Sequence, residues 1–197
     1  MSGHDCGNFA PALAAAADAV LSGRRRRVLL IVADRARPGE RLMANGLSVF
    51  SDGAAACLVG AEPPGRPGFL VDAIVNRTEV PGGQETADAA ILSTVRLAQA
   101  GTGALLRATG LERSDFSHLV LPNYRIPSQV FLAAAMGFAR ERLLFGAVRS
   151  RAHCFSADAL ITLGEQGAAG ALAAGERIVT GGGGPHSWSC VALTRTP

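Results

Sequence analysis

Two short and almost wholly apolar runs constrain the fold of this chain more than any other feature. Residues 28–34 read VLLIVAD and residues 53–61 read GAAACLVGA, and polar or turn-forming residues flank both runs. Continuous apolar runs of this length are typical of strands that are buried on both faces beneath covering helices. The chain is therefore predicted to be an α/β protein, and its 48% apolar composition can supply a large core.

The rest of the chain alternates between helical and extended patterns. The period of the apolar residues predicts helices over 7–22, 86–109, 127–140 and 155–175, and further strands over 69–80, 118–121, 142–146, 177–180 and 187–195. The second part carries a fuller set of strands than the first, which begins with a helix that no strand precedes. We therefore expect that the chain starts within a domain.

Charge and cysteine content exclude several classes of protein. The net charge is only +3, and the one basic cluster, Arg24–Arg27, is typical of a solvated turn and too short for nucleic-acid binding. An acidic carrier protein or a phosphorylated cofactor is the alternative partner for this cluster. The four cysteines show neither CxxC pairing nor zinc spacing, which predicts free thiols and no metal site. No signal peptide or uninterrupted membrane-length run is present, so we expect a cytoplasmic protein without a membrane segment.

A cysteine stands at the start of the first predicted helix. Cys6 is followed by Gly7 and Asn8 and then by an alanine-rich stretch. A helix N-terminus carries about half a positive charge and unpaired N–H groups, which both favour a thiolate. Cys6 is therefore a candidate nucleophile, and a terminal cysteine without a role is an equally good interpretation of this stretch alone.

Other residues further along the chain could contribute to a site. Four glycines at 181–184 are expected to form a loop whose N–H groups approach a ligand, with a flexible hairpin loop as the alternative. His153 lies in a polar loop that enters a helix, which makes it a candidate catalytic residue. His118 begins a strand about 16 Å from Asn123 and is assigned to the surface, while His186 is the reserve candidate.

Taken in order, these segments resemble the β-ketoacyl-acyl-carrier-protein synthase III family. The stretch CGNFAPALAAAADAVLSGRRRRVLLIVAD resembles the nucleophile, helix and strand of the family, FSDGAAACLVG resembles its Asp-Gly-Ala strand, and RIVTGGGGPHSWSCVALTR its last glycine loop and strand. The resemblance covers the whole chain but only the part of the family from the cysteine onward. It implies a thiolase-like fold, with an incomplete N-terminal half in residues 1–82 and a complete C-terminal half in residues 83–197.

The resemblance also implies an activity. Cys6 would be acylated by a thioester of coenzyme A or of an acyl-carrier protein and would pass the acyl group on, in fatty-acid-like or specialised-metabolite (polyketide) biosynthesis. Cys6, Asn123 and His153 are the implied catalytic residues. The N–H groups of Cys6 and Gly184 form the implied oxyanion hole, in which such donors are worth about 3–4 kcal/mol each. No cofactor beyond the thioester substrate is implied, and the position of the nucleophile near the family's dimer interface implies a homodimer.

The sequence departs from the family at its catalytic pair. Asn123 stands where the family has histidine, and His153 stands where it has asparagine. The exchange keeps acylation of Cys6 feasible with His153 as base or proton shuttle. It makes the decarboxylation of a malonyl group less secure, because imidazole and amide differ in reach and in proton affinity. Acyl transfer to an unusual acceptor is therefore favoured over routine fatty-acid initiation.

Two smaller departures concern the glycine run and the carrier. Pro185 stands where a glycine would continue the run, and proline removes an N–H group and fixes φ. Ser128 stands where the family often has an arginine for carrier docking, a role that Arg125 could take.

The part of the family that precedes the nucleophile has no counterpart in this sequence. Without it the strand at 28–34 is expected to expose an apolar edge. We therefore expect either a reading frame that starts too late or a separate N-terminal polypeptide that complements the chain. A non-catalytic partner subunit or a truncated remnant is the alternative function.

Overall fold

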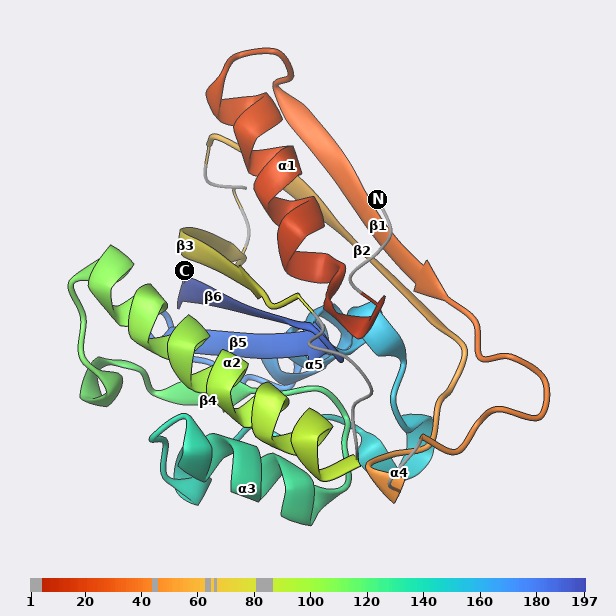
Figure 1. Cartoon of the computed structure of the whole chain (residues 1–197). Helices are drawn as coiled ribbons and strands as arrows, with labels where there is room; N and C mark the ends of the chain where they lie inside the picture. Colours follow the sequence, from red (N-terminus) through yellow and green to blue (C-terminus); the bar gives the residue numbers. More distant parts are fainter. Residues whose placement is uncertain (1–4, 44–45, 63–64, 66, 81–86) are drawn as a thin grey trace.

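The chain alternates between helices and strands, which confirms the predicted α/β class (Figure 1). This computed structural model describes residues 5–43, 46–62, 65, 67–80 and 87–197. The elements are η1 (Asp5–Gly7), α1 (Phe9–Leu21), β1 (Arg27–Asp34), β2 (Gly53–Gly60), β3 (Phe69–Thr78), α2 (Ala87–Thr109), η3 (Arg113–Asp115), β4 (His118–Val120), α3 (Ile126–Ala135), η4 (Arg140–Arg142), α4 (Val148–Arg151), η5 (Phe155–Ala157), α5 (Asp158–Ala168), β5 (Arg177–Gly184) and β6 (Ser187–Arg195).

The strands form two separate sheets. β1 and β2 form an antiparallel pair, and β3, β6, β5 and β4 form a four-stranded sheet in that order. Only β4 and β5 run parallel in the larger sheet. β3 joins this sheet although it precedes residue 83, so the second sheet takes one strand from the segment predicted as the first half. The division into residues 1–82 and 83–197 stays a prediction.

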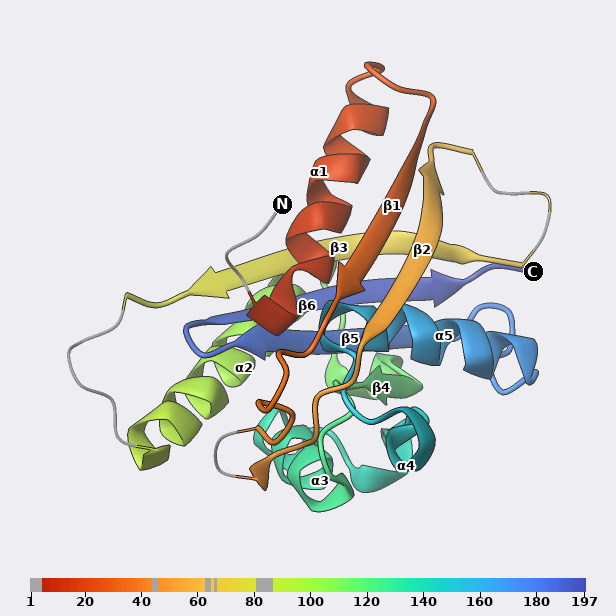
Figure 2. The same cartoon turned by 90° about the vertical axis from the view of Figure 1, so that its right-hand side faces the viewer.

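The smaller sheet is covered on one face only. On the face that α1 and η5 cover, Leu30 and Val32 of β1 are buried, whereas Leu29 and Ile31 on the other face are 61% and 62% exposed. Figure 2 shows α1, β1 and β2 rising away from the four-stranded sheet. The prediction that β1 and β2 are buried on both faces is wrong, because no described layer covers their outer face. The edge expected to be exposed at residues 28–33 is open among the described residues, since β1 pairs with β2 alone in this sheet.

The larger sheet has a hydrophobic core on each face. Along β6, Trp188, Cys190 and Ala192 belong to the core with α2 and α3, whereas Val191 and Leu193 belong to the core with α1 and α5. This alternation follows from the two-residue period of a strand. Both faces of the sheet therefore hold it rigidly, and the N-terminus of α1 is anchored against it.

Helix α2 is the longest helix of the described chain. By length and composition alone, residues 89–109 could cross a membrane. In the fold, however, α2 packs on β3 and β6, and Ala98, Thr102 and Leu105 are fully buried there. We conclude that α2 is a core helix of the sheet layer.

The glycines at 181–184 form the end of β5 and not a loop. They pair with residues 187–190 of β6, and none of the four has a positive φ. A Cβ atom at Gly183 would lie 2.0 Å from the carbonyl oxygen of Ser187, so glycine is required by the close approach of the two strands. The predicted loop is therefore wrong, and residues 185–186 make a two-residue turn instead.

Several element boundaries also differ from the sequence prediction. α3 ends at Ala135 because Gly137 follows with a φ of +82°, and the predicted helix over 155–175 is reduced to η5 and α5. The predicted strand at 142–146 is reduced to a single bridge between Leu143 and Leu119.

We predict opposite effects for alanine at two glycines. Gly183→Ala should lower the free energy of unfolding by about 1–3 kcal/mol, because the new Cβ meets backbone atoms. Gly164→Ala, on the exposed surface of α5 with no atom within 4 Å of the new Cβ, should raise it by about 0.5–1 kcal/mol. Thermal unfolding of both variants checks this, and equal melting temperatures would contradict it.

Candidate active site

Cys6 lies in η1, directly before the first turn of α1. η1, which we call the Cys6 turn, packs against β5, β6 and η5, and the Cys6 side chain is half-buried. Asn8, two residues later, is the N-cap of α1. The N–H groups at this end of the helix create a positive potential, which is the physical basis for the predicted nucleophile.

Gly7 lets the Cys6 turn approach the end of β5. A Cβ atom at Gly7 would lie 3.1 Å from Cα of Gly183 and 3.6 Å from the backbone nitrogen of Gly184. The Gly184 N–H donates to Ser187 Oγ over 3.3 Å, a long hydrogen bond to a side chain that can rotate. The Gly184 N–H thus lies beside the Cys6 turn, and its role as an oxyanion donor stays a prediction.

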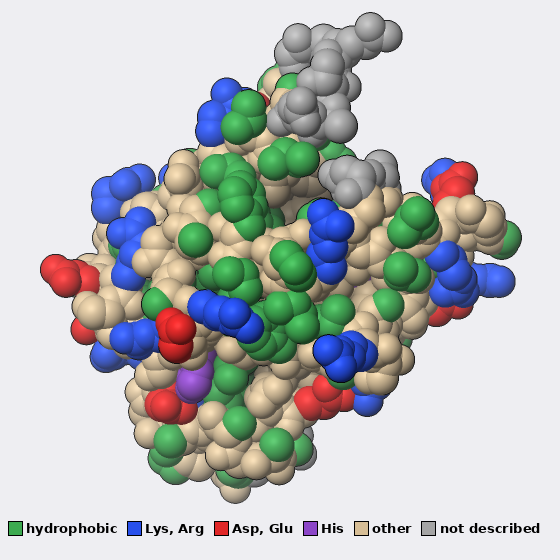
Figure 3. Space-filling model, turned by 90° about the horizontal axis from the view of Figure 1, so that it is seen from below, with side chains coloured by type: hydrophobic (Ala, Val, Ile, Leu, Met, Phe, Trp, Pro, Cys, Tyr) green, Lys and Arg blue, Asp and Glu red, His purple; other side chains and the backbone are tan. Residues whose placement is uncertain are grey.

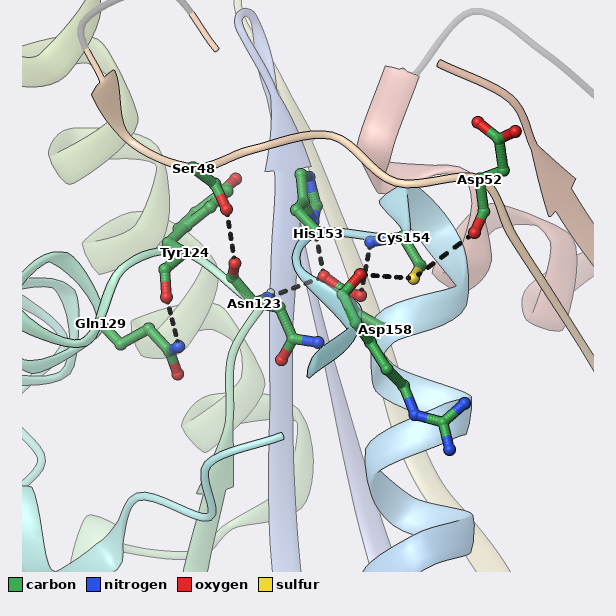
Figure 4. A network of polar contacts seen from close by, with 9 residues as sticks. Ser48, Asp52, Asn123, Tyr124, Gln129, His153, Cys154 and Asp158 are labelled. Carbon is green, nitrogen blue, oxygen red and sulfur yellow. Dashed lines mark hydrogen bonds and ion pairs between the residues drawn. The ribbon is translucent and has the colours of Figure 1, made fainter. Parts of the chain in front are cut away.

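His153 and Asp158 form a buried pair (Figure 4). His153 Nδ1 lies 2.5 Å from Asp158 Oδ2, and the two side chains are 0% and 2% exposed. Because a carboxylate oxygen only accepts, Nδ1 donates, and the neutral ring then carries its lone pair on Nε2. Nε2 has no hydrogen-bond partner among the described residues. The carboxylate therefore fixes the tautomer of a fully buried imidazole.

Main-chain groups also hold the Asp158 carboxylate. Oδ1 accepts the N–H of Cys154 at 2.8 Å, and Oδ2 accepts the N–H of Asn123 at 2.7 Å. Asp158 is in addition the first residue of α5, where the helix dipole favours a negative charge. These contacts offset the cost of removing a carboxylate from water.

The backbone on both sides of His153 is strained. Ala152 has a φ of 55° and Phe155 has a φ of 53°, and a non-glycine residue in such a region costs about 1–3 kcal/mol. The His153 N–H donates to the carbonyl oxygen of Val49, and the His153 carbonyl accepts the N–H of Ser51, both at 2.9 Å. Pairing with the segment that precedes β2 therefore holds this loop in place.

Asn123 contributes its main chain to the site. Its N–H donates to the buried carboxylate, and its carbonyl oxygen accepts Ser48 Oγ–H at 2.7 Å. Its side-chain amide has no hydrogen-bond partner among the described residues. A Cβ atom at Gly146 would lie 2.3 Å from Asn123 Oδ1 and 2.5 Å from Thr162 Oγ1, so the amide lies beside these two residues. In Figure 4 it points away from the His153 ring.

Three aromatic rings surround the His153 imidazole. The Tyr124 ring packs edge-on at 5.2 Å, and the Phe50 and Phe155 rings each lie 5.7 Å from it. Phe50 and Phe155 stack on each other at 4.6 Å. The rings shield the imidazole from water and leave it few alternative orientations.

The Tyr124 hydroxyl is affected by charge on both Cys6 and Asp158. Burial raises the pKa of the Tyr124 hydroxyl, and negative charge on Cys6 and Asp158 raises it further. Cys6 therefore lies within electrostatic reach of the residue whose ring contacts His153.

Cys6 and Asp158 line one small pocket. Its walls also include Pro122, Phe155 and Gly182, and its volume is about 30 Å³. The pocket at Cys6 is therefore small.

Two histidines lie outside this region. His118 Nε2 pairs with Glu176 Oε2 at 3.2 Å, at the far end of β4 from Asn123, as the sequence analysis expects. His186 lies in the turn between β5 and β6, where its carbonyl accepts the N–H of Glu79. Within the described ranges, no three His, Cys, Asp or Glu residues are arranged to hold a metal ion.

Sequence reasoning missed Asp158. An aspartate in the first turn of a helix is ordinarily explained as a favourable partner of the helix dipole. That explanation gives no reason to expect the side chain to be buried. The available signal is the spacing, because Asp158 follows His153 by five residues and shares the buried face of α5 with Thr162.

One family model matches the N-terminal part of the chain. Residues 3–76 match the model described as 3-oxoacyl-[acyl-carrier-protein (ACP)] synthase III. No curated protein matches the chain.

Solved structures with the same fold extend the match to nearly the whole chain. Synthase III from Thermus thermophilus covers 96% of this chain and 65% of its own, with a TM-score of 0.79 and 20% identity. ChlB3, named as an acyltransferase, covers 98% and 66% with a TM-score of 0.81 and 18% identity. Cerulenin-bound OleA from Xanthomonas covers 97% and 63% with a TM-score of 0.80 and 18% identity.

These matches confirm the resemblance and the thiolase-like fold. The chain spans about two thirds of the length of these structures. At such identities the solved structures show the fold alone, so the chemistry of the site has to be argued from this chain's own residues.

We predict that Tyr124, the only tyrosine of the chain, keeps its proton well above pH 10 in the folded protein. Tyrosine in the unfolded chain ionises near pH 10, so the folded state is stabilised below that pH and loses stability as the pH rises above it. Absorbance of tyrosinate near 295 nm, titrated with and without denaturant, measures both pKa values. Ionisation of the folded protein near pH 10 would contradict the burial of this hydroxyl.

Proposed function

We propose that this chain carries the reactive part of a cysteine acyltransferase that resembles the synthase III enzymes. In this proposal Cys6 is the nucleophile, His153 is the general base, and Asp158 orients the imidazole. The observation that carries the proposal is the buried His153 ring, with Nδ1 held by a carboxylate and Nε2 without a partner. Its loop continues into η5, against which the Cys6 turn packs.

The first step of the proposed reaction is acylation of Cys6. His153 Nε2 takes the thiol proton, and the Cys6 thiolate attacks the carbonyl carbon of an acyl thioester. The N–H groups of Cys6 and Gly184 would stabilise the oxyanion, with Ser187 Oγ giving way at Gly184. The carbon–sulfur bond to the leaving group then breaks, and the imidazolium returns its proton to the departing thiolate.

The second proposed step passes the acyl group to an acceptor. His153 Nε2 takes a proton from a hydroxyl or amine, which attacks the acyl carbon and releases the Cys6 thiolate. Decarboxylative condensation is disfavoured, because the Asn123 amide lies beside Gly146 and Thr162 and points away from the His153 ring.

The donor is proposed to be acyl-coenzyme A or an acyl-carrier protein. Arg125, the residue considered for carrier docking, is exposed, and its Nε donates to Ser128 Oγ. On the face shown in Figure 3, basic and acidic side chains are interspersed and do not form one large basic patch. The pathway, whether fatty-acid-like or specialised, and the cytoplasmic location remain part of this proposal.

The open face of β1 and β2 is proposed to be covered in the active assembly. The chain repeats one arrangement: α1 precedes the antiparallel pair β1–β2, and α5 precedes the antiparallel pair β5–β6. The second pair is flanked by β4 and β3 and covered by α2, whereas the first pair has none of these layers in the described chain. A complementing N-terminal polypeptide with equivalent elements would complete it, and a homodimer would then form around the nucleophile segment.

A non-catalytic partner subunit is the second candidate function. The observation in its favour is the small pocket at Cys6, with a volume of about 30 Å³. The two functions differ in whether Cys6 forms a covalent adduct.

We predict that acyl-coenzyme A of several chain lengths acylates Cys6. Intact-protein mass spectrometry should show one acyl adduct that is absent in Cys6→Ala and forms at least about 100-fold more slowly in His153→Gln. Cys57→Ala is the matched control and should be acylated like the wild type, since burial raises the pKa of the Cys57 thiol. If no thioester yields an adduct, the chain is a non-catalytic partner.

We also predict that the open apolar face drives self-association of the isolated chain. Ile31→Glu should reduce concentration-dependent association in light scattering without lowering the melting temperature, because Ile31 is 62% exposed. Leu92→Glu is the control, with the same exposure on α2 and outside this face. A wild-type chain that stays a 20.2 kDa monomer at all concentrations would argue against a covered face.

A further inference from the structure

The segment Leu47–Asp52, which we call the strap, belongs to the connection between β1 and β2 but lies against the loop of His153. Phe50 forms a parallel bridge with His153, and the two flanking main-chain hydrogen bonds are both 2.9 Å long. At its end, Asp52 accepts the N–H of Ala36 at 3.0 Å and pairs with Arg41 at 3.5 Å. The strap is therefore fixed to the first part of the connection between β1 and β2 while it contacts the loop that carries the proposed base.

Ser48 joins the strap to the second loop of the site. Its side chain is 8% exposed, and its hydroxyl donates to the Asn123 carbonyl at 2.7 Å. The other end of Asn123 donates its N–H to the Asp158 carboxylate, which in turn holds His153 Nδ1. Figure 4 shows this chain of contacts from Ser48 to His153. A shift of the Asn123 loop would move a donor of that carboxylate.

Phe50 adds a contact with the imidazole loop through its ring. It stacks on Phe155 at 4.6 Å with an interplanar angle of 2°, and both rings lie 5.7 Å from the His153 ring. Phe155 and Ala152 both have a positive φ. A loop in such a conformation relaxes unless its surroundings hold it, and the strap supplies that restraint.

We propose that Ser48 and Phe50 are positioning residues that fix the His153 imidazole toward Cys6. The inference rests on the proposed function, since it presupposes that His153 takes the Cys6 proton. It makes reactivity at Cys6 depend on a polar and an aromatic side chain of the connection between β1 and β2. It also assigns to Asn123 a role through its main chain, as the link between Ser48 and Asp158.

The test compares alkylation of Cys6 by chloroacetamide at pH 6 and pH 9 in the full chain, followed by mass spectrometry of the Cys6 peptide. At pH 9 an ordinary thiol, with a pKa near 8.5, is ionised without help. At pH 6 proton transfer to His153 raises the fraction of thiolate above that of an ordinary thiol. The ratio of the rate at pH 6 to the rate at pH 9 therefore reports the placement of the imidazole in the folded protein.

Ser48→Ala should lower this ratio by about 3- to 10-fold, the value of one hydrogen bond. Ser48→Thr keeps a hydroxyl and should restore the ratio to within about twofold. Phe50→Leu, which removes the ring stacking, should lower the ratio as well and provides a second variant if Ser48→Ala does not fold. Ser150→Ala, exposed on α4, is the matched control and should behave like the wild type.

His153→Gln separates the two levels of the proposal. If His153→Gln lowers the ratio but Ser48→Ala and Phe50→Leu do not, the strap has no positioning role, and the proposed function stands. If His153→Gln alkylates like the wild type, the proposed base is wrong, and the inference falls with it. A loss in Ser48→Ala that Ser48→Thr does not restore would overturn the role of the hydroxyl.

Discussion

The site depends on one buried carboxylate. Asp158 accepts three hydrogen bonds, from the imidazole of His153 and from the N–H groups of Cys154 and Asn123. A buried carboxylate without such partners is strongly unfavourable, so these donors are constrained together. The loop after β4 and the loop before α5 are thereby joined at one point, beside the turn that carries Cys6. The proposed chemistry rests on this junction.

The four-stranded sheet and the β1–β2 pair support different parts of the candidate site. β5 and β6 are buried on both faces and hold the Cys6 turn at the glycine end of β5, where Gly7 and Gly183 approach closely. β1 and β2 are covered on one face only, yet the strap that connects them contacts His153 and Asn123.

Local patterns predicted much of the fold. The helices at 9–21 and 87–109 follow from their apolar period and from Gly23 and Gly110, and the strands follow from β-rich apolar runs. The prediction of a loop at 181–184 was wrong because close strand pairing and a loop both favour glycine. Cys6 and His153 were identified as candidates from local context, whereas Asp158 was missed because its burial depends on segments distant in sequence.

The sequence by itself determined the α/β class and the thiol at a helix N-terminus, because both depend only on neighbouring residues. The tertiary structure alone decided which groups meet. It placed the Asn123 main chain, and not its amide, on the Asp158 carboxylate, and it left one face of β1 exposed. Such contacts join residues that are distant in the sequence, such as Ser48 and Asn123, which lie 75 positions apart, and no local pattern specifies them.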